Sequence, residues 1–244
     1  HLQYLDREQA SIRCGISVPS GGWWFASAGW IRPPSLCRTL LATGAEKIRQ
    51  HWNVAIQRLQ YRDGVWQVWD AQGHCIAQAP VLVLANAAEA ATLLPDLQLP
   101  LSRIRGQITY LPQGELPSFE AVLCRDGYVL PNVAGQHVLG ASYDFGVHAP
   151  ALLAAPQQQN LQRLAELLPV AAQAYVDLPL NGRVGFRCVS SDRMPLVGAI
   201  ADTQVAIDAG TRLMQIPRQT GLYCLSGLGS RGVVWSGIAA ELLA

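Results

Sequence analysis

The stretch that most constrains the fold is 221–232, where a short apolar run leads into a glycine turn and then an apolar segment. Gly227, Gly229 and Gly232 fit the spacing G-x-G-x-x-G, which in a dinucleotide-binding unit places a pyrophosphate on a helix N-terminus. That unit also needs a second strand and an acidic residue about 20 positions on. Only 12 residues follow Gly232 in this sequence, so the dinucleotide-binding unit does not fit here. The residues therefore predict a strand, a tight turn and a helix start whose backbone N–H groups face an electron-rich group. The alternative is a glycine turn that only lets strand and helix pack closely.

Turn residues and hydrophobic periodicity divide the chain into interleaved helical and extended segments, with no internal repeat and no low-complexity linker. The run Val81–Leu84 is apolar on both sides, which predicts a strand covered by two layers. Residues 1–30 are rich in glycine and aromatic residues, and Gly21–Phe25 indicate a turn that leads into a strand. Helices are expected from a start near 33–35 through 49, over 157–168 with a stop at Pro169, and over 233–243. Strands are expected over 54–56, 65–69, 81–84, 104–111, 121–130, 137–143 and 222–225, the group between 104 and 143 forming a meander.

Composition removes several classes of protein. Half of the residues are hydrophobic and 14% are charged, which excludes a disordered segment. The 18 basic and 17 acidic residues nearly cancel, so no overall positive field attracts nucleic acid or anionic lipid, and an RNA contact would need a local patch. No run of about 18 apolar residues occurs, so we expect no membrane-spanning helix.

Cysteine and histidine spacing argues against metal and hydrolase sites. The six cysteines are far apart with no C-x-x-C pair, which disfavours zinc and iron–sulfur sites, so no metal is expected. Reduced, buried, structural thiols in a cytoplasmic protein are the simplest account. The histidines have no serine or carboxylate at a spacing typical of a catalytic site, and no G-x-S-x-G occurs, which disfavours a hydrolase. The start at His1 has neither an initiator Met nor a signal-peptide layout, so we expect a cut inside a longer protein.

Several motifs resemble, in order and spacing, the D-amino-acid-oxidase-like family of FAD-dependent amine oxidases, over nearly the whole chain. Within that family the stretches 23–37 and 221–243 are most similar to the oxidoreductase domain of bifunctional enzymes that modify the tRNA wobble uridine. The matching motifs are Gly29–Cys37, Val81–Ala85, Arg105–Gln107, Gly127–Pro131, Gly185–Arg187 with Asp192–Gly198, and Gly227–Gly232.

The resemblance implies a mixed α/β (α+β) fold like that of glycine oxidase: a partial FAD/NAD(P)-binding Rossmann-like domain and an antiparallel-sheet substrate domain. Residues 35–98 and 185–244 would belong to the FAD-binding domain, and 1–34 and 99–184 to the substrate domain. Members of the family begin with a G-x-G-x-x-G unit, and this sequence, which is expected to start at a cut, does not contain that N-terminal unit. The implied partners in the parent chain are this FAD-binding segment and a methyltransferase domain. Without the segment, the chain alone is expected to bind FAD poorly.

The resemblance also implies site residues. The backbone of the closing turn would contact the flavin, and Val54 would contact adenine through main-chain groups. Arg187 matches the arginine that binds the substrate carboxylate, for which a guanidinium fork is suited; on the residues alone, pairing with Asp192 in a turn is the alternative. Tyr128 and Tyr143 would line the substrate cavity or belong to the core. The implied cofactor contacts are Val54, Gly227, Gly229, Ser230, Arg231 and Gly232.

Two further residues, Arg105 and Gln107, look like part of the strand that crosses between the two domains in this family. From the sequence, a role in the site and a structural role are equally open for them.

The implied reaction is FAD-dependent oxidative removal of the carboxymethyl group from 5-carboxymethylaminomethyl-(2-thio)uridine at the tRNA wobble position. Hydride would leave the carbon beside the amine, and hydrolysis of the imine would give 5-aminomethyl-uridine, for later methylation, and glyoxylate. Two alternatives stay open: an FAD-dependent oxidase of free glycine, sarcosine or a D-amino acid, and a truncated noncatalytic module. The expected partner is tRNA, with no membrane.

Overall fold

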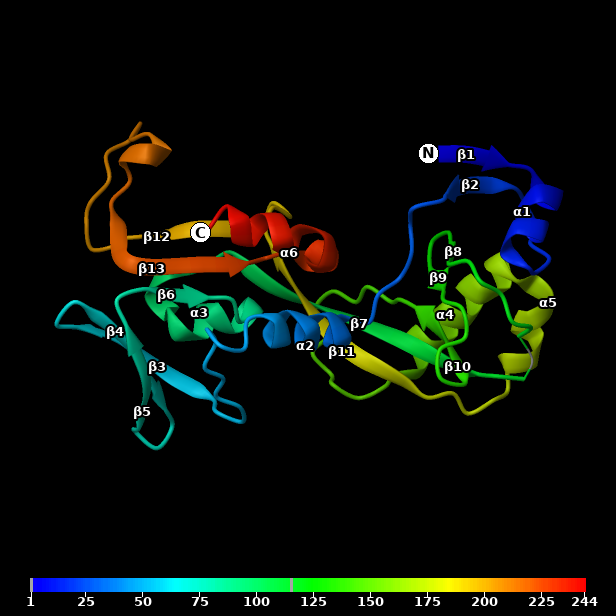
Figure 1. The fold of residues 1–244 in the computed structure, drawn as a ribbon, viewed down its shortest axis with the longest axis horizontal. Helices are drawn as coiled ribbons and strands as arrows, with labels where there is room; N and C mark the ends of the chain where they lie inside the picture. The colour runs from blue at the N-terminus through cyan, green and yellow to red at the C-terminus, as the bar shows by residue number, and fades with distance from the viewer. Residues whose placement is uncertain (1, 115) are drawn as a thin grey trace. The chain divides into compact units, whose positions relative to one another are not determined.

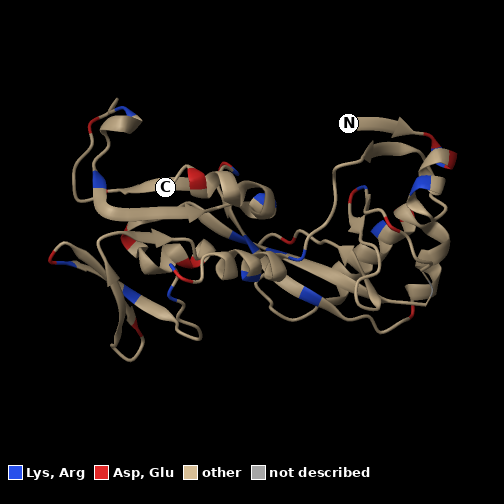
Figure 2. Ribbon diagram, viewed as in Figure 1, with Lys and Arg blue, Asp and Glu red and all other residues tan. Residues whose placement is uncertain are grey.

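The computed structural model describes residues 2–114 and 116–244, which form two compact units of mixed α and β structure (Figure 1). Unit 1 comprises the residues through Leu36 together with Ile104–Phe186, and unit 2 comprises Cys37–Arg103 together with Arg187–Ala244. Each unit is therefore built from two separate stretches of chain. Figure 2 shows Lys and Arg interspersed with Asp and Glu in both units, in line with the balanced composition.

The largest sheet is antiparallel, but the meander predicted between 104 and 143 is wrong in its strand order, because the last of its strands pairs between the other two. β10 (Gln136–Gly140) pairs with β7 (Leu101–Pro112) on one side and with β9 (Tyr128–Val129) on the other, and β8 (Leu123–Cys124) pairs with β9. The predicted strand 121–130 is a short hairpin instead, because the chain turns within it, where Arg125 N–H donates to Gly127 O at 2.8 Å. The sheet order is β11 (Gly182–Ser190), β7 (Leu101–Pro112), β10 (Gln136–Gly140), β9 (Tyr128–Val129) and β8 (Leu123–Cys124).

The core of unit 1 forms where helix α4 (Ala154–Leu167) packs with this sheet. The predicted leucine stripe is buried there, since Leu164 and Leu168 are at most 3% exposed. The helix ends before Pro169, as predicted, because the residue before a proline is disfavoured in helical conformation. Leu111 and Leu139 supply the facing side chains of the sheet. The helix α5 (Pro169–Ala172) and the turn η3 (Gln173–Tyr175) complete this region.

An N-terminal motif that the sequence did not predict packs on this core. β1 (Leu2–Leu5) pairs antiparallel with β2 (Gly22–Phe25), and α1 (Arg7–Cys14) connects them. Asp6 caps α1 and exchanges hydrogen bonds with Gln9 in a capping box, and Gly15 ends the helix in a left-handed conformation. The strand predicted after Gly21 is confirmed as β2.

Unit 2 is organised around a three-stranded sheet. β13 (Arg218–Ser226) lies in the centre, parallel to β6 (Leu82–Leu84) and antiparallel to β12 (Leu196–Ala201). Leu84, Leu222 and Cys224 are almost fully buried in its core. The prediction that 81–84 is covered on both sides is wrong for the described residues, since Val81 and Val83 remain 54% and 42% exposed. Within the part of the chain described, β6 pairs on one edge only.

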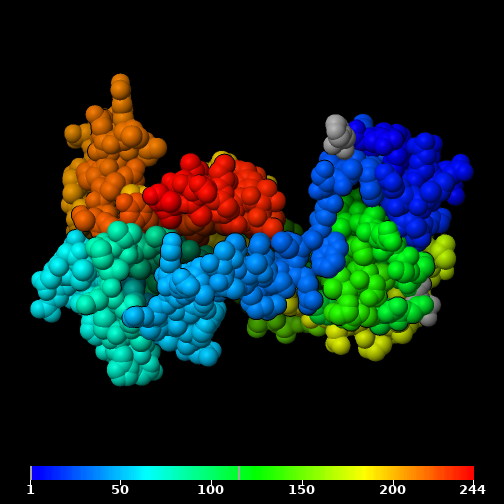
Figure 3. Space-filling view, viewed as in Figure 1, coloured from blue at the N-terminus to red at the C-terminus, as the bar shows by residue number. Residues whose placement is uncertain are grey.

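A second, antiparallel sheet and several short helices complete unit 2. The expected helix through residue 49 is shorter, because α2 (Pro33–Thr43) ends at Gly44, which makes a turn to Leu40 O. Helix α6 (Gly232–Glu241) lies on the face that Figure 3 shows. Val234 and Ile238 of this helix are mostly exposed. Among the described residues no helix is long and apolar enough to cross a membrane. The elements are β3 (Ile56–Arg62), β4 (Val65–Asp70), β5 (Cys75–Ala79), η1 (Ala87–Glu89), α3 (Ala90–Leu93), η2 (Pro95–Leu97), η4 (Leu213–Gln215), η5 (Gly229–Arg231) and α6 (Gly232–Glu241).

Candidate functional site

The carboxyl ends of the two parallel strands of unit 2 meet at one edge of the sheet. Leu84 of β6 is level with Cys224 of β13, so the turns that follow the two strands emerge side by side. Ser226 joins these turns, because its Oγ donates to Ala87 O at 3.1 Å. Ligands of open parallel sheets bind beyond the carboxyl ends of the strands. This edge is therefore the candidate site in unit 2.

The glycine turn after β13 has the conformation that the spacing predicted. Gly227 and Gly229 have φ values of 71° and 58°, in the left-handed region that other residues adopt at a cost. Gly229–Arg231 then forms η5, which leads directly into α6. Within the described chain, no side chain caps the N-terminus of η5 or of α6. This end therefore offers backbone N–H donors of the kind that bind an electron-rich group.

A second turn is fastened to the start of α6. The Asp192 carboxylate accepts a hydrogen bond from Met194 N–H at 2.9 Å and another from Ser190 Oγ at 2.9 Å. These donors hold the pKa of the Asp192 carboxyl below its ordinary value. The Arg231 guanidinium donates to Arg193 O at 2.8 Å and lies 4.9 Å from the Trp235 ring centroid. The side chain of Arg231 thus links the turn to the helix, while its backbone belongs to the glycine turn.

Arg187 lies on β11, three residues before Ser190, and is partly buried in unit 2. The alternative reading made it the partner of Asp192. The hydrogen bonds that Asp192 receives from Met194 and Ser190 already hold that turn, so the turn does not require an arginine.

A cavity of about 520 Å³ in unit 2 is lined by residues beside the end of β6, among them Leu84 and Asn86. Val54 also lines this cavity and is 38% exposed. Val54, which is predicted to contact adenine, and the turn after β6 therefore line the same cavity. Ser226 and Ala87 are functional candidates that the sequence reasoning missed. The only signal for them is a polar residue at the end of an apolar strand.

The two predicted substrate-cavity tyrosines lie in unit 1 and differ in environment. Tyr128 is level with Gly140 on the neighbouring strand, and a Cβ on that glycine would lie 2.8 Å from Tyr128 Oη. The ring therefore packs tightly over the glycine. Tyr143 is 39% exposed, and its ring centroid is 5.2 Å from that of Phe145.

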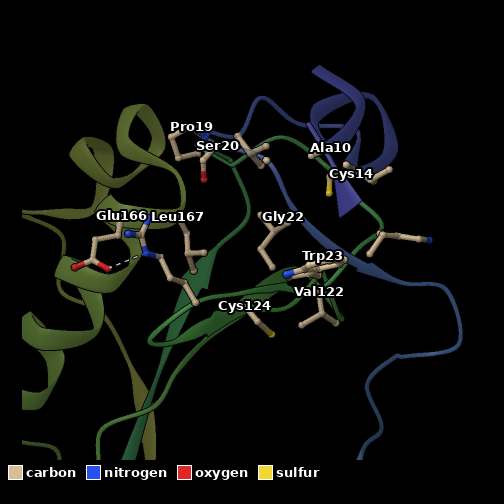
Figure 4. Close-up of a pocket in the computed structure, with 16 residues that line it drawn as sticks. Ala10, Cys14, Pro19, Ser20, Gly22, Trp23, Val122, Cys124, Glu166 and Leu167 are labelled. Atoms are coloured by element: carbon tan, nitrogen blue, oxygen red, sulfur yellow. Dashed lines mark ion pairs between the residues drawn. The ribbon is translucent and has the colours of Figure 1, made fainter. Parts of the chain in front are cut away.

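A separate cavity of about 410 Å³ lies in unit 1, and none of the predicted site residues lines it (Figure 4). Trp23 and Cys14 line it, and Arg125 and Glu166 form an ion pair there at 3.8 Å. Burial raises the pKa of the Cys14 thiol. The expectation of buried thiols is wrong for half of the cysteines. Cys14, Cys188 and Cys224 are buried, and Cys37, Cys75 and Cys124 are exposed.

The chain is similar to known proteins over its whole length. The model of the family described as FAD dependent oxidoreductase matches residues 1–244. The tRNA 5-methylaminomethyl-2-thiouridine biosynthesis bifunctional protein MnmC of Azoarcus sp. is 43% identical over 244 residues, which are 100% of this chain and 38% of that protein. The protein of the same name from Ralstonia nicotianae is 44% identical over 256 residues, which cover 100% of this chain and 39% of that protein. The chain thus spans well under half the length of the curated relatives it matches.

Solved structures show the same fold. Iminodiacetate oxidase from Chelativorans sp. BNC1 superposes with a TM-score of 0.77 at 22% identity, covering 100% of this chain and 62% of that one. Glycine oxidase from Geobacillus kaustophilus gives a TM-score of 0.73 at 18% identity, covering 100% of this chain and 61% of that one. The expected fold class, a mixed α/β protein like glycine oxidase, is confirmed.

Proposed function

The chain belongs to the FAD dependent oxidoreductase family, and from this premise we propose that it is the oxidase part of a tRNA-modifying enzyme. The reaction is oxidative removal of the carboxymethyl group from 5-carboxymethylaminomethyl-(2-thio)uridine at the wobble position. Its products are 5-aminomethyl-uridine, for later methylation, and glyoxylate. The observation that carries the proposal is the uncapped glycine turn beside the ends of β6 and β13, in a chain 43% identical to a tRNA-modifying protein.

The residues present fit FAD. An isoalloxazine ring becomes electron-rich when it is reduced, and the uncapped start of α6 supplies N–H donors of the kind that stabilise such charge. The cavity beside Val54 and Asn86 offers room next to the same strand end. Bound FAD would supply the two-electron acceptor for the C–H bond beside the substrate amine. The residues proposed to hold it are Val54, Gly227, Gly229, Ser230, Arg231 and Gly232.

The chain's own side chains bind and orient the substrate in this proposal. Arg187 is assigned to the carboxylate of the carboxymethyl group, because a guanidinium can hold it through two parallel hydrogen bonds. Fixing that carboxylate sets the position of the adjacent carbon, whose hydride is removed. Tyr143 and Tyr128 are assigned to the remainder of the substrate. The role of Tyr143 is supported by its partial exposure, whereas Tyr128 also packs on Gly140.

Further parts of the parent protein belong to the proposal. The chain spans 38% of its relative from Azoarcus. Its described strand β6 has one open edge, and Val83 within the strand and Val81 just before it are exposed. Both observations support an additional FAD-binding segment elsewhere in the parent chain. A methyltransferase domain in the parent, tRNA as partner and a cytoplasmic location complete the proposal.

The test uses the full-length flavoprotein and tRNA that carries the carboxymethylaminomethyl group. We expect loss of that group from the tRNA nucleosides, with glyoxylate formed in equal amount. The Arg187→Leu enzyme should retain flavin but lose turnover at low tRNA concentration. Turnover of free glycine or sarcosine with no change in the tRNA would favour the amino-acid oxidase instead. A colourless, inactive full-length protein would favour the noncatalytic module.

A further inference from the structure

A charged side chain lies fully buried in unit 1 and holds a segment that lacks regular secondary structure. Arg105 of β7 has no exposed surface, and its Nη1 donates to Asp144 Oδ2 at 2.7 Å. The other hydrogen bonds run from Nε to Ala149 O at 2.9 Å, and from Nη2 to Ala151 O at 2.7 Å and to Gln107 Oε1 at 2.8 Å. One guanidinium therefore fastens the chain at Asp144, Ala149 and Ala151.

Gln107 fastens the same segment at both of its ends. It lies two residues after Arg105 on β7, so its side chain points to the same face. Its Oε1 accepts from Leu153 N–H at 2.9 Å, and its Nε2 donates to Leu153 O at 3.0 Å. Its backbone N–H donates to Ser142 Oγ at 2.9 Å, and that hydroxyl donates to Asp144 Oδ2 at 2.8 Å. The whole stretch 142–153 is thus tied to Arg105 and Gln107 of one strand.

These hydrogen bonds determine the direction of the Tyr143 side chain, which lies between the anchored residues Ser142 and Asp144. Asp144 forms an antiparallel bridge with Arg105, so the backbone there is extended and alternate side chains face opposite sides. Ser142 and Asp144 face the buried network, which directs Tyr143 the other way. Tyr143 and Phe145 are 39% and 65% exposed, and their rings meet at an interplanar angle of 63°. The anchored segment therefore displays a pair of aromatic rings.

Stability alone does not account for an ion pair at this place. Replacing a buried ion pair by well-packed apolar residues is often neutral or stabilising, because desolvation of both charges offsets their attraction. The core of unit 1 already contains the fully buried Leu111, Leu139 and Leu164. What a guanidinium adds over an apolar side chain is a set of directional hydrogen bonds to backbone carbonyls. These bonds fix the position of the segment.

We propose that Arg105 is a positioning residue, which holds residues 142–153 so that Tyr143 and Phe145 form a stacking surface for the planar base of the substrate. Exposed aromatic rings are the groups on which proteins stack unpaired RNA bases. The inference rests on the proposed function, because that function supplies a nucleobase as part of the substrate. It resolves the open choice for Arg105: the side chain is structural in its contacts and acts on the substrate through the aromatic pair.

The kinetic test is a mutant cycle in the full-length flavoprotein with modified tRNA. Arg105→Lys keeps the charge but loses the planar fork, and Tyr143→Ala with Phe145→Ala removes the stacking surface. We expect each change to raise KM roughly tenfold to hundredfold, with a smaller effect on kcat. When they are combined, Arg105→Lys should add nothing to the loss of the aromatic pair. Independent, multiplying effects would overturn the positioning role.

A structural readout separates this inference from the proposed function. Hydrogen–deuterium exchange over 142–153 should increase in Arg105→Lys and in the second variant, Asp144→Asn. The matched control is Tyr175→Phe, which removes the hydrogen bond that another fully buried side chain of unit 1 donates to Pro112 O at 3.1 Å. It should lower stability without changing exchange over 142–153 or KM. A wild-type enzyme that leaves modified tRNA unchanged would reject the proposed function, whereas unchanged exchange in both variants would reject the positioning role whatever the substrate is.

Discussion

At Gly221 the strand β13 passes close to Pro80, just before β6, and the replacement of this glycine by alanine has a cost that the structure allows us to work out. A Cβ at this position would lie 2.1 Å from Pro80 O and 3.3 Å from Pro80 C, and both are backbone atoms. The φ of Gly221 is also positive, at 65°. The left-handed conformation costs about 1–2 kcal/mol for alanine, and overpacking adds about 1–3 kcal/mol. We therefore expect Gly221→Ala to lower the free energy of unfolding of unit 2 by about 2–5 kcal/mol.

Gly64, in the turn between β3 and β4, is the matched control. Its φ of 82° carries the same conformational cost, but nothing lies within 4 Å of its added Cβ. Gly64→Ala should therefore cost only about 1–2 kcal/mol. The assay is thermal release of flavin from the full-length flavoprotein, followed by flavin fluorescence, because displacement of β6 from β13 disturbs both turns at the strand ends. Equal release temperatures for the two variants would refute the claim that the close approach to Pro80 matters.

Three other changes probe the site and its surroundings. Arg187→Leu should raise KM for the modified tRNA roughly 100-fold while flavin absorbance stays normal. The control Arg183→Leu, at an exposed position of the same strand, should change neither KM nor flavin absorbance. Equal KM values for wild type and Arg187→Leu in steady-state kinetics would rule out the carboxylate role. The pKa of Asp192 is lowered by folding, so its stabilising effect is present above the ordinary value of 3.8 and is lost as pH falls through the folded-state pKa. The stability gap between wild type and Asp192→Asn, measured by denaturant unfolding, should therefore close in acid, and a gap independent of pH would contradict this. Burial raises the pKa of Cys224 to about 11, so iodoacetamide at pH 8 should alkylate the exposed Cys37 first and Cys224 only on unfolding; peptide mapping that finds Cys224 modified in the folded protein would show the thiol to be accessible.

Local signals in the sequence predicted much of the fold, because they depend on neighbours along the chain. The glycine spacing at 227–232 predicted a turn between a strand and a helix, and the structure has both. The leucine stripe of α4 and its stop before Pro169 were likewise readable from periodicity. Helix α1 was missed although Asp6, Gln9 and Gly15 carry cap signals, because it buries only two residues and its apolar pattern is weak.

Features that depend on distant partners were not predictable. The apolar run at 81–84 indicated burial on both faces, but pattern alone does not say which layers are present. The hydrogen bonds from Arg105 and Gln107 to the segment 142–153 join residues 35 to 46 positions apart, so no spacing rule reveals them. The tie between Ser226 and Ala87 spans 139 residues. At the candidate site, the residue types were readable from the sequence, whereas the contacts that fix them were not.

The parallel pairing of β6 with β13 has a consequence for biosynthesis. Ala87 leaves the ribosome 139 residues before Ser226, and at typical elongation speeds the interval is on the order of 10 s. Unit 1 is largely synthesised in that interval, since most of its chain lies between the two halves of unit 2. During this time the nascent β6, with its apolar Leu82–Leu84, lacks its partner strand β13. Such an unpaired strand is a template for association with other chains. Slower elongation between the two strands should therefore reduce the yield of native protein more than an equal delay after Ser226.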